Sequence, residues 1–352
     1  MKIGILTFHE SNNYGAALQC YALQEVLKSM GHDVWVINYD YRNSGVGSYG
    51  LLPHKNVLNH LFNPMVLAKF FLRTIMYHCL YARGFDRFRA KHLRLTSEFR
   101  KAKMMPQNFD LYVLGSDQLW SIQCTGWQVE PVFFGQFPHP GGSRIVGYAI
   151  SANEDSLNMI GADQIRKYAA NFNCVSVREP GIAKWLKTSN VCDARIDVDP
   201  TLLLDPKDWL KITSAQRPCK QRYLLSYYLK PDQKQAGKTF AKRNGLKYVE
   251  VGFKAHSPIE FLNWVKHADC VVGGSFHITV FSILFGRPFY TIRKNGSFDI
   301  RSASLLKAVG LENRFIPVSE LSNLGIPPCQ YSEAKIAIEG LKARSLEYLE
   351  NL

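Results

Sequence analysis

The sequence predicts an α/β protein made of two Rossmann-like domains that face each other across a cleft. The chain has 352 residues, which is more than one compact core ordinarily contains. Short apolar segments alternate with helical segments, as they do in proteins with parallel α/β sheets. This alternation stops at residues 204–221, a polar stretch with two prolines, and then starts again. We therefore assign residues 1–205 to one domain and residues 206–352 to the other.

The first domain begins with a β-α-β unit. Residues 2–8 form a short apolar strand, residues 14–31 have a helical periodicity that ends at a glycine, and residues 33–39 form the next strand. Further strands, with helical segments between them, are expected at residues 109–120, 143–151, 174–179 and 194–204.

The second domain repeats this alternation and ends in a long helix. The expected strands are residues 222–229, 246–253, 269–274 and 287–292, and the expected helices are residues 232–245, 257–268 and 275–286. Residues 333–352 have the pattern of an amphipathic helix. We expect this C-terminal helix to pack back on the first domain.

The positive charge is concentrated in one segment. The formal net charge is +14, and residues 50–105 contain eleven Lys or Arg against two acids, which gives +9. Within this basic helical insert, residues 64–88 are apolar and aromatic, but Lys69 and Arg73 interrupt them, which argues against a transmembrane helix. Three interpretations stay open: a helix in a membrane interface, a helix over an anionic substrate groove, or a helix pair with a solvated basic face. No RNA-binding or helix-turn-helix pattern accompanies the charge, so we expect no nucleic-acid partner.

The cysteines and the N-terminal residues indicate a cytoplasmic protein. The apolar run after Lys2 is too short for an export signal. The eight cysteines are scattered without a CxxC pair, which argues against a disulfide framework and suits a reducing compartment. The same scatter gives no metal-ligand spacing, so we expect no metal site.

Polar clusters follow four of the predicted strands, where open α/β sheets bind their ligands. In the first cluster Asn13, Tyr14 and Gly15 open a helix, and N–H groups at a helix start favour an anion or a hydroxyl-rich ligand. An ordinary helix cap by Asn13 is an equal alternative. The cluster lacks GxGxxG spacing and therefore does not predict a dinucleotide site.

The second cluster lies in the loop that ends the strand predicted within residues 109–120. Asp117, beside Ser116, is a candidate to accept a proton from a sugar hydroxyl. Trp120 is a candidate to stack on a sugar ring. Alternatively, Asp117 only caps the turn.

The third cluster contains Arg178, which directly follows an apolar strand. Its planar guanidinium suits a carboxylate or a phosphate. The alternative is a structural arginine that pairs with Glu179 or another acid.

The fourth cluster starts the apolar helix at residues 275–286. Ser275 is the expected cap, and His277 lies in the first turn, where the helix dipole and the N–H groups favour an anion. A protonated imidazole would add a charge-assisted contact, whereas the alternative is a histidine that only packs against its neighbours. Together the four clusters supply Arg, His, Asp and N–H donors around one cleft. This inventory fits a small anion and a polyol.

With these clusters in view, the chain resembles the polysaccharide pyruvyl transferase family. The segments that carry the resemblance occur in the expected order from residue 3 to about 315: TFHESNNYGAALQCYAL, GSDQLW, SVREPG, VDPTLLL, SFHITVFSILFGRPF and RSASLLKAVGLENR. The resemblance implies a fold similar to the two-domain GT-B glycosyltransferases. It also implies an enzyme that moves pyruvate from phosphoenolpyruvate to a sugar as a cyclic ketal.

The resemblance further implies roles for single residues. Arg178 and His277 resemble the family's phosphoenolpyruvate-binding arginine and histidine. Phe276, next to the predicted cap, takes the position whose backbone contacts the donor, and Asp117 resembles an essential aspartate. Ile278 is a departure, because the family commonly has glycine after the histidine.

The implied reaction needs no metal and no cofactor, since phosphoenolpyruvate serves as the co-substrate. The expected acceptor is a sugar of a surface polysaccharide, such as a capsule or exopolysaccharide, or of its lipid-linked precursor. On this hypothesis the basic insert draws the enzyme to the anionic inner face of the membrane. The alternative function is a GT-B-type glycosyltransferase that uses a nucleotide sugar. Candidate acceptor-binding residues are Asn13, Tyr14, Gly15, Ser116 and Trp120.

Overall fold

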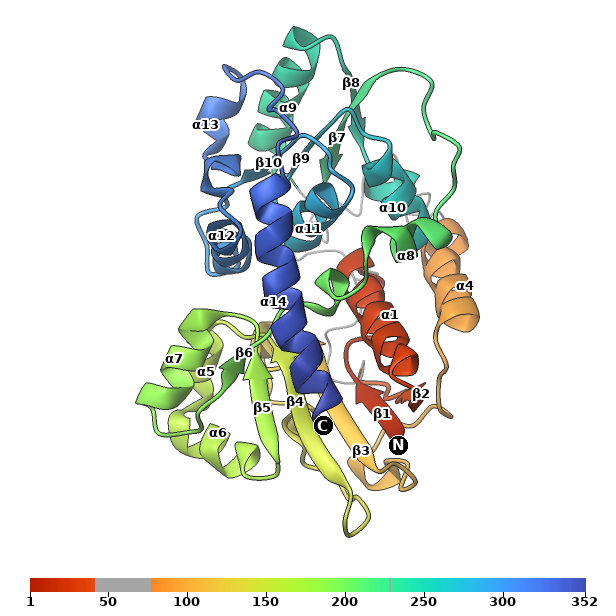
Figure 1. The fold of residues 1–352 in the computed structure, drawn as a ribbon, viewed down its shortest axis with the longest axis vertical. Helices are drawn as coiled ribbons and strands as arrows, with labels where there is room; N and C mark the ends of the chain where they lie inside the picture. The colour runs from red at the N-terminus through yellow and green to blue at the C-terminus, as the bar shows by residue number, and fades with distance from the viewer. Residues whose placement is uncertain (42–76, 228) are drawn as a thin grey trace, which may run out of the picture.

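The computed structural model describes residues 1–41, 77–227 and 229–352, which form two parallel β-sheets (Figure 1). The first sheet has the strand order β2-β1-β3-β4-β5-β6, and the second has the order β11-β10-β9-β7-β8. The strands of the first sheet are β1 (Lys2–Leu6), β2 (Asp33–Val36), β3 (Leu111–Asp117), β4 (Arg144–Ile150), β5 (Cys174–Val177) and β6 (Arg195–Ile196). Those of the second are β7 (Tyr223–Tyr227), β8 (Lys247–Glu250), β9 (Cys270–Gly273), β10 (Phe289–Ile292) and β11 (Phe315–Ile316). The two sheets confirm the predicted fold class, a GT-B-like pair of Rossmann-like α/β domains.

Helices connect most of the parallel strands, as crossover connections require. We call the part of the chain that carries the first sheet the first half, and the part that carries the second sheet the second half. In the first half the helices are α1 (Tyr14–Ser29), α4 (Arg83–His92), α5 (Glu154–Ile160), α6 (Ala162–Ala169) and α7 (Pro180–Thr188). The second half contains α8 (Pro206–Lys211), α9 (Pro231–Arg243), α10 (Pro258–Lys266), α11 (Phe276–Leu284), α12 (Asp299–Ala308), α13 (Val318–Leu321) and α14 (Ser332–Glu350). Short helical turns lie at Tyr77–Ala82, Ala102–Met104, Ile122–Cys124, Pro131–Phe134, Pro200–Leu202, Gly252–Lys254 and Glu312–Arg314.

Helix α1 begins with a side-chain cap and ends before a glycine. The side chain of Asn13 accepts hydrogen bonds from the backbone N–H groups of Gly15 at 2.9 Å and of Ala16 at 3.3 Å. The helix stops just before Gly31, whose φ of +85° lies in the left-handed region that favours glycine. The cap at Asn13 fixes the start of α1, which follows the carboxyl end of β1 after the loop of residues 7–13.

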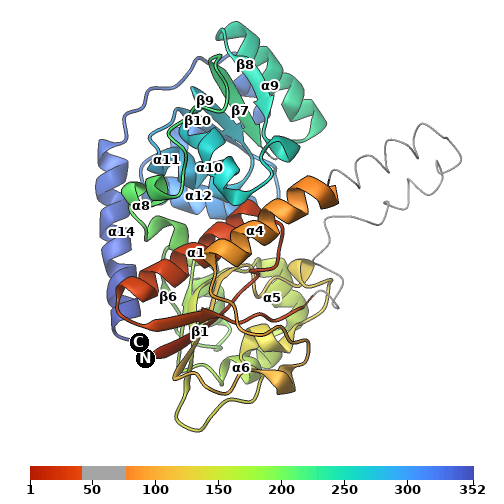
Figure 2. The ribbon, with the colours of Figure 1, turned by 90° about the vertical axis from the view of Figure 1, so that its right-hand side faces the viewer.

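The two halves share one continuous hydrophobic core. Tyr14 and Phe85, from the first half, belong to the same buried cluster as Phe261 and Phe281 from the second. The rings of Tyr14 and Phe261 are stacked with their centroids 4.5 Å apart. Figure 2 shows α1 and α4, which contact each other, lying between the two halves. The apolar faces of these helices therefore join the halves.

Helix α14 crosses both halves (Figure 1). Near its start, Ile338 packs into the core shared with the second half. Near its end, Leu349 packs against the first sheet, and the hydroxyl of Tyr348 donates a hydrogen bond to the carbonyl oxygen of Gly147 in β4 at 3.1 Å. The last helix thus docks on strands that lie some 200 positions earlier in the chain.

Much of the basic insert predicted at residues 50–105 lies outside the described residues. Its interpretations as a membrane-interface helix or a groove cover, and peripheral contact with a membrane, therefore stay predictions of the sequence. The described end of the insert includes α4, which buries Phe85 and Phe88 in the shared core. No helix in the described ranges is both long enough and apolar enough to cross a lipid bilayer.

Candidate functional site

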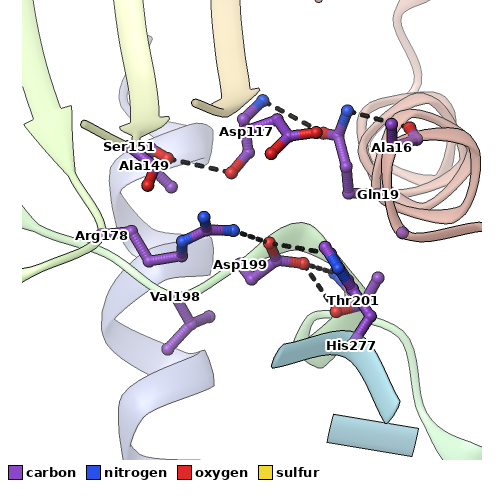
Figure 3. Close-up of polar contacts among 12 residues, drawn as sticks. Ala16, Gln19, Asp117, Ala149, Ser151, Arg178, Val198, Asp199, Thr201 and His277 are labelled. Atoms are coloured by element: carbon purple, nitrogen blue, oxygen red, sulfur yellow. Dashed lines mark hydrogen bonds and ion pairs between the residues drawn. The ribbon is translucent and has the colours of Figure 1, made fainter. Parts of the chain in front are cut away.

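Three segments of the first half and one of the second meet where the two sheets face each other (Figure 3). Strand β3 ends at Asp117, β5 is followed by Arg178, and residues 197–199 follow β6. Helix α11 brings its first turn, with His277, to the same place. Polar side chains that are far apart in the sequence therefore lie together at the carboxyl ends of the strands.

Asp199, which the sequence analysis did not single out, lies at the centre of this group. It is fully buried, forms an ion pair with Nη1 of Arg178, and places Oδ2 3.5 Å from Nε2 of His277. Its Oδ1 accepts hydrogen bonds from the hydroxyl of Thr201 at 2.6 Å and from the backbone N–H of Thr201 at 3.0 Å. Burial raises the pKa of Asp199, but the contacts with His277, Arg178 and Thr201 outweigh burial and hold this pKa well below its ordinary value. One ionised carboxylate thus joins the two predicted donor-binding residues.

The guanidinium of Arg178 is largely used for internal pairing. Nε donates to Oε1 of Glu179 at 3.0 Å, and Nη1 pairs with Asp199. The group also lies 4.7 Å from the ring centroid of Phe276, in a cation–π contact. Burial lowers the pKa of Arg178, but Glu179, Asp199 and Asp117 together raise it above its ordinary value. Nη2 is buried without a hydrogen-bond partner among the described residues, so the predicted structural pairing leaves one donor for a ligand.

The imidazole of His277 is buried between the two halves. A Cβ added at Gly15 would lie 2.0 Å from Nδ1, so the start of α1 approaches the ring this closely only because it has no side chain there. The ring of Phe276 packs edge-on against the imidazole, with the two ring centroids 5.1 Å apart. Ser275 takes the predicted cap position of α11, but its side chain forms no capping hydrogen bond. His277 therefore contacts α1 on one edge of the ring and Asp199 on the other.

Asp117 has the backbone conformation of a constrained strand end. Its φ is +87°, a region that costs a non-glycine residue about 1–3 kcal/mol and that is frequent at functional sites. Its Oδ1 accepts a hydrogen bond from the backbone N–H of Gln118 at 2.9 Å, as the turn-capping alternative predicts. The side chain is nevertheless only half-buried, and its charge contributes to the raised pKa of Arg178.

Two candidate acceptor residues, Ser116 in β3 and Trp120 just after it, are in the core, which contradicts their prediction as sugar contacts. Trp120 is fully buried, stacks on Phe134 with the ring centroids 5.2 Å apart, and donates its indole N–H to the carbonyl oxygen of Phe133 at 3.1 Å. Ser116 is also fully buried, and its hydroxyl donates to the carbonyl oxygen of Ala149 at 2.9 Å. Both side chains point into the interior of the first half, so neither can contact a sugar.

The first cluster is also used for structure. Tyr14 is buried, and its hydroxyl, which has one hydrogen to donate, lies within hydrogen-bond distance of the carbonyl oxygens of Gly252 at 2.9 Å and of Ala255 at 2.5 Å, which joins the two halves. Burial is the main cause that raises the pKa of Tyr14. The prediction of Tyr14 as an acceptor contact is therefore wrong. Asn13 remains half-buried, but its side-chain oxygen is the α1 cap, which is the alternative that the sequence analysis left open.

A cavity of about 350 Å³ adjoins the buried group of charges. Its lining includes Arg178, Glu179, Asp199, Phe276 and Arg301. Arg301 belongs to the first turn of α12 and was not predicted, because its only signal was a place at the start of the segment RSASLLKAVGLENR. Over the described ranges, no group of three or more His, Cys, Asp or Glu side chains is arranged to hold a metal ion.

The sequence matches one known protein family. A model of the family described as polysaccharide pyruvyl transferase matches residues 13–294 of the chain, which is well over half of its length. No curated protein is significantly similar to the sequence.

Several solved structures align with almost the whole chain at low identity. UDP-GlcNAc 2-epimerase from Neisseria meningitidis, bound to UDP-GlcNAc, is 10% identical with a TM-score of 0.44, over 97% of this chain and 99% of that chain. UGT89C1 from Arabidopsis thaliana, in complex with UDP-L-rhamnose, is 9% identical with a TM-score of 0.46, over 99% and 94%. A putative UDP-N-acetylglucosamine 2-epimerase from Listeria monocytogenes is 10% identical with a TM-score of 0.46, over 96% and 94%.

Proposed function

The chain belongs to the polysaccharide pyruvyl transferase family, and from this premise we propose that it moves pyruvate from phosphoenolpyruvate to a sugar of a surface polysaccharide or of its lipid-linked precursor. The product is a cyclic ketal, and inorganic phosphate is released. The observation that carries this proposal is the contact of Arg178 and His277, from opposite halves, with the same buried carboxylate, that of Asp199.

The donor-binding chemistry matches the charges of the site. Phosphoenolpyruvate carries a carboxylate and a phosphate, and both groups favour guanidinium, imidazolium and N–H donors. Arg178 keeps Nη2 without a partner in the described residues, which supports a role in binding the donor carboxylate or phosphate. His277, Phe276 and Ser275 stand at the start of α11, where the helix dipole adds a favourable field for an anion.

The proposed reaction proceeds by proton transfer and two additions to one carbon. An acid protonates the methylene carbon of the donor, so that positive character develops at C2. A sugar hydroxyl adds to C2 and gives its proton to a base, the bond from C2 to the phosphate oxygen breaks, and a second hydroxyl closes the ketal with loss of its own proton.

Two residues are the candidates for these proton transfers. His277 either binds the phosphate or serves as the acid, and Asp199 beside it orients the ring and offsets a positive charge on it. Asp117, at the end of β3, is the candidate base or acceptor anchor.

Replacement of His277 by alanine tests the proposal. We expect His277→Ala to lower the rate of acceptor-dependent phosphate release from phosphoenolpyruvate by about 10²–10⁴-fold, because the ring acts on the donor. The assay uses a panel of lipid-linked galactosides, with ketal products detected by mass. The matched control is His139→Ala, which removes an exposed imidazole at a surface turn and should leave the rate unchanged.

Two results would count against this scheme. An unchanged rate in His277→Ala would remove the histidine from the mechanism. A wild-type protein that is stabilised thermally by UDP-sugars, but not by phosphoenolpyruvate, would favour the glycosyltransferase alternative.

A further inference from the structure

Arg301 and Arg178 line the same cavity. Arg301 belongs to α12 in the second half, whereas Arg178 follows β5 in the first half. The cavity of about 350 Å³ is at the lower end of the range of about 300–1,000 Å³ for small-molecule sites. A space of this size suits a small metabolite better than a nucleotide sugar.

The two arginines differ in how they are paired. Arg178 has two carboxylate partners, Glu179 and Asp199. Arg301 forms no ion pair with any described residue, and its Nε is shielded from solvent without a hydrogen-bond partner. Its guanidinium lies 5.5 Å from the ring centroid of Phe298, a contact that offsets little of the cost of removing part of the charged group from water. A buried donor without a partner is destabilising unless a ligand completes it.

The charges around Arg301 also favour an anionic ligand. Burial lowers the pKa of Arg301, and the charge of Arg178 lowers it further, against the opposite effects of Asp117 and Glu179. Two guanidinium groups close to each other in a space of low dielectric repel each other. Each also has one buried N–H group without a partner among the described residues, on Nη2 of Arg178 and on Nε of Arg301. A ligand with two anionic groups would satisfy both donors and reduce the repulsion.

We propose that Arg301 is a second donor-binding residue, which holds one acidic group of phosphoenolpyruvate from the second half while Arg178 holds the other from the first half. This inference rests on the proposed function, and it adds a residue to the donor site rather than a new substrate. The donor then bridges the two halves where the cavity lining, at Asp199 and Phe276, adjoins His277, which does not itself line the cavity. Arg301 acts by binding and takes no part in proton transfer.

The test compares Arg301→Met with wild type and with the control Arg222→Met, which replaces an exposed arginine that pairs at the surface with Asp269. The probes are phosphoenolpyruvate and inorganic phosphate, measured by calorimetric titration and by thermal unfolding. We expect Arg301→Met to weaken the binding of phosphoenolpyruvate by about 10- to 100-fold, the loss of a hydrogen bond to a charged group. The KM for phosphoenolpyruvate should rise, while the KM for the acceptor stays unchanged.

Stability without a ligand separates binding from a structural role. If Arg301 gains an ionic partner only when an anion binds, Arg301→Met removes a half-buried charge that has no ionic partner among the described residues, so the free protein should unfold at an equal or higher temperature than wild type. The temperature shift caused by phosphoenolpyruvate should be lost. An Arg301→Met protein that is less stable when free and yet binds phosphoenolpyruvate normally would overturn the inference.

The outcomes also separate this inference from the proposed function. If wild type binds phosphoenolpyruvate and Arg301→Met binds it equally well, only the role of Arg301 fails. If wild type binds inorganic phosphate but neither binds nor consumes phosphoenolpyruvate, the proposed function fails, and the assignment of Arg301 to this donor fails with it. Loss of phosphate binding in Arg301→Met would then still identify an anion site at this position.

Discussion

Asp199 connects the two side chains that the sequence predicts as donor-binding residues. An asparagine at this position keeps the shape but removes the negative charge between Arg178 and His277. We expect Asp199→Asn to lower the free energy of unfolding by about 3–5 kcal/mol at pH 7, because the arginine loses a buried partner. Activity should fall as well, with a changed pH profile, since the field at the imidazole changes. Chemical denaturation and the pH dependence of turnover measure the two effects.

The pH dependence of stability follows from the lowered pKa of Asp199. A carboxyl whose pKa is lower in the folded state than the ordinary value of about 3.9 stabilises the fold above that value. The contribution is lost as the pH falls from about 4 through the folded-state pKa. Wild type should therefore lose more stability than Asp199→Asn over this acidic range. Parallel losses in the two proteins would show that Asp199 is not ionised in the fold.

At the scale of single residues, the sequence reveals candidate site residues where a charged or polar side chain interrupts an apolar pattern. Arg178 and His277 were recognisable because each is an ionisable side chain that comes shortly after an apolar strand. The direction of a side chain depends instead on distant packing, which is why Trp120 was interpreted as a sugar contact and is buried against Phe134. Arg301 could not be predicted, because only the folded chain places it near Arg178.

At the scale of elements, the important contact is between the first turns of α1 and α11. Gly15 allows α1 to reach the ring of His277, and an added Cβ would collide with Nδ1. We expect Gly15→Ala to displace the imidazole and to lower turnover strongly, while the overpacking costs about 1–3 kcal/mol of stability. Turnover and denaturant unfolding are to be measured together.

Gly340→Ala is the control for this substitution. Gly340 lies in the exposed part of α14, and no atom lies near an added Cβ, so alanine should raise helix stability by up to about 1 kcal/mol without an effect on turnover. Full activity in Gly15→Ala would show that the position of the ring has no influence on the reaction.

The order of strands and helices was accessible to the sequence, but some boundaries were not. Residues 109–120 were expected to form a strand and then a loop, and they contain β3, which ends at Asp117 where the chain turns. The polar stretch at residues 204–221 was interpreted as a break, yet it contains α8, whose Trp209 is fully buried in the core. A six-residue helix has too few positions for a periodic pattern, so only tertiary packing reveals it.

At the scale of the whole molecule, the shared core predicts cooperative unfolding. Phe261 of the second half is fully buried and stacks on Tyr14 of the first half. We expect calorimetry of wild type to show one unfolding transition and not one for each half. Phe261→Ala should lower the free energy of unfolding by about 3–5 kcal/mol and shift that single transition. Two separate transitions in wild type would contradict the coupling.

This coupling of the halves was not predictable from the sequence. The apolar face of α1 reads as the inner face of an ordinary sheet-covering helix, although part of it packs against the second half. The close approach at Gly84, where an added Cβ would lie 1.6 Å from the carbonyl oxygen of His256, is likewise invisible before the fold is known.

The hydrophobic core around Tyr14, which both halves share, also limits how small molecules can enter and leave the site. Swinging the halves apart would expose stacked aromatic rings to water, at a cost that grows with every square ångström uncovered. The cavity beside α14 extends to Arg195 and Arg344, both of which reach solvent. Under the proposed function, the donor would enter and phosphate would leave through this arginine-lined opening, without separation of the two halves.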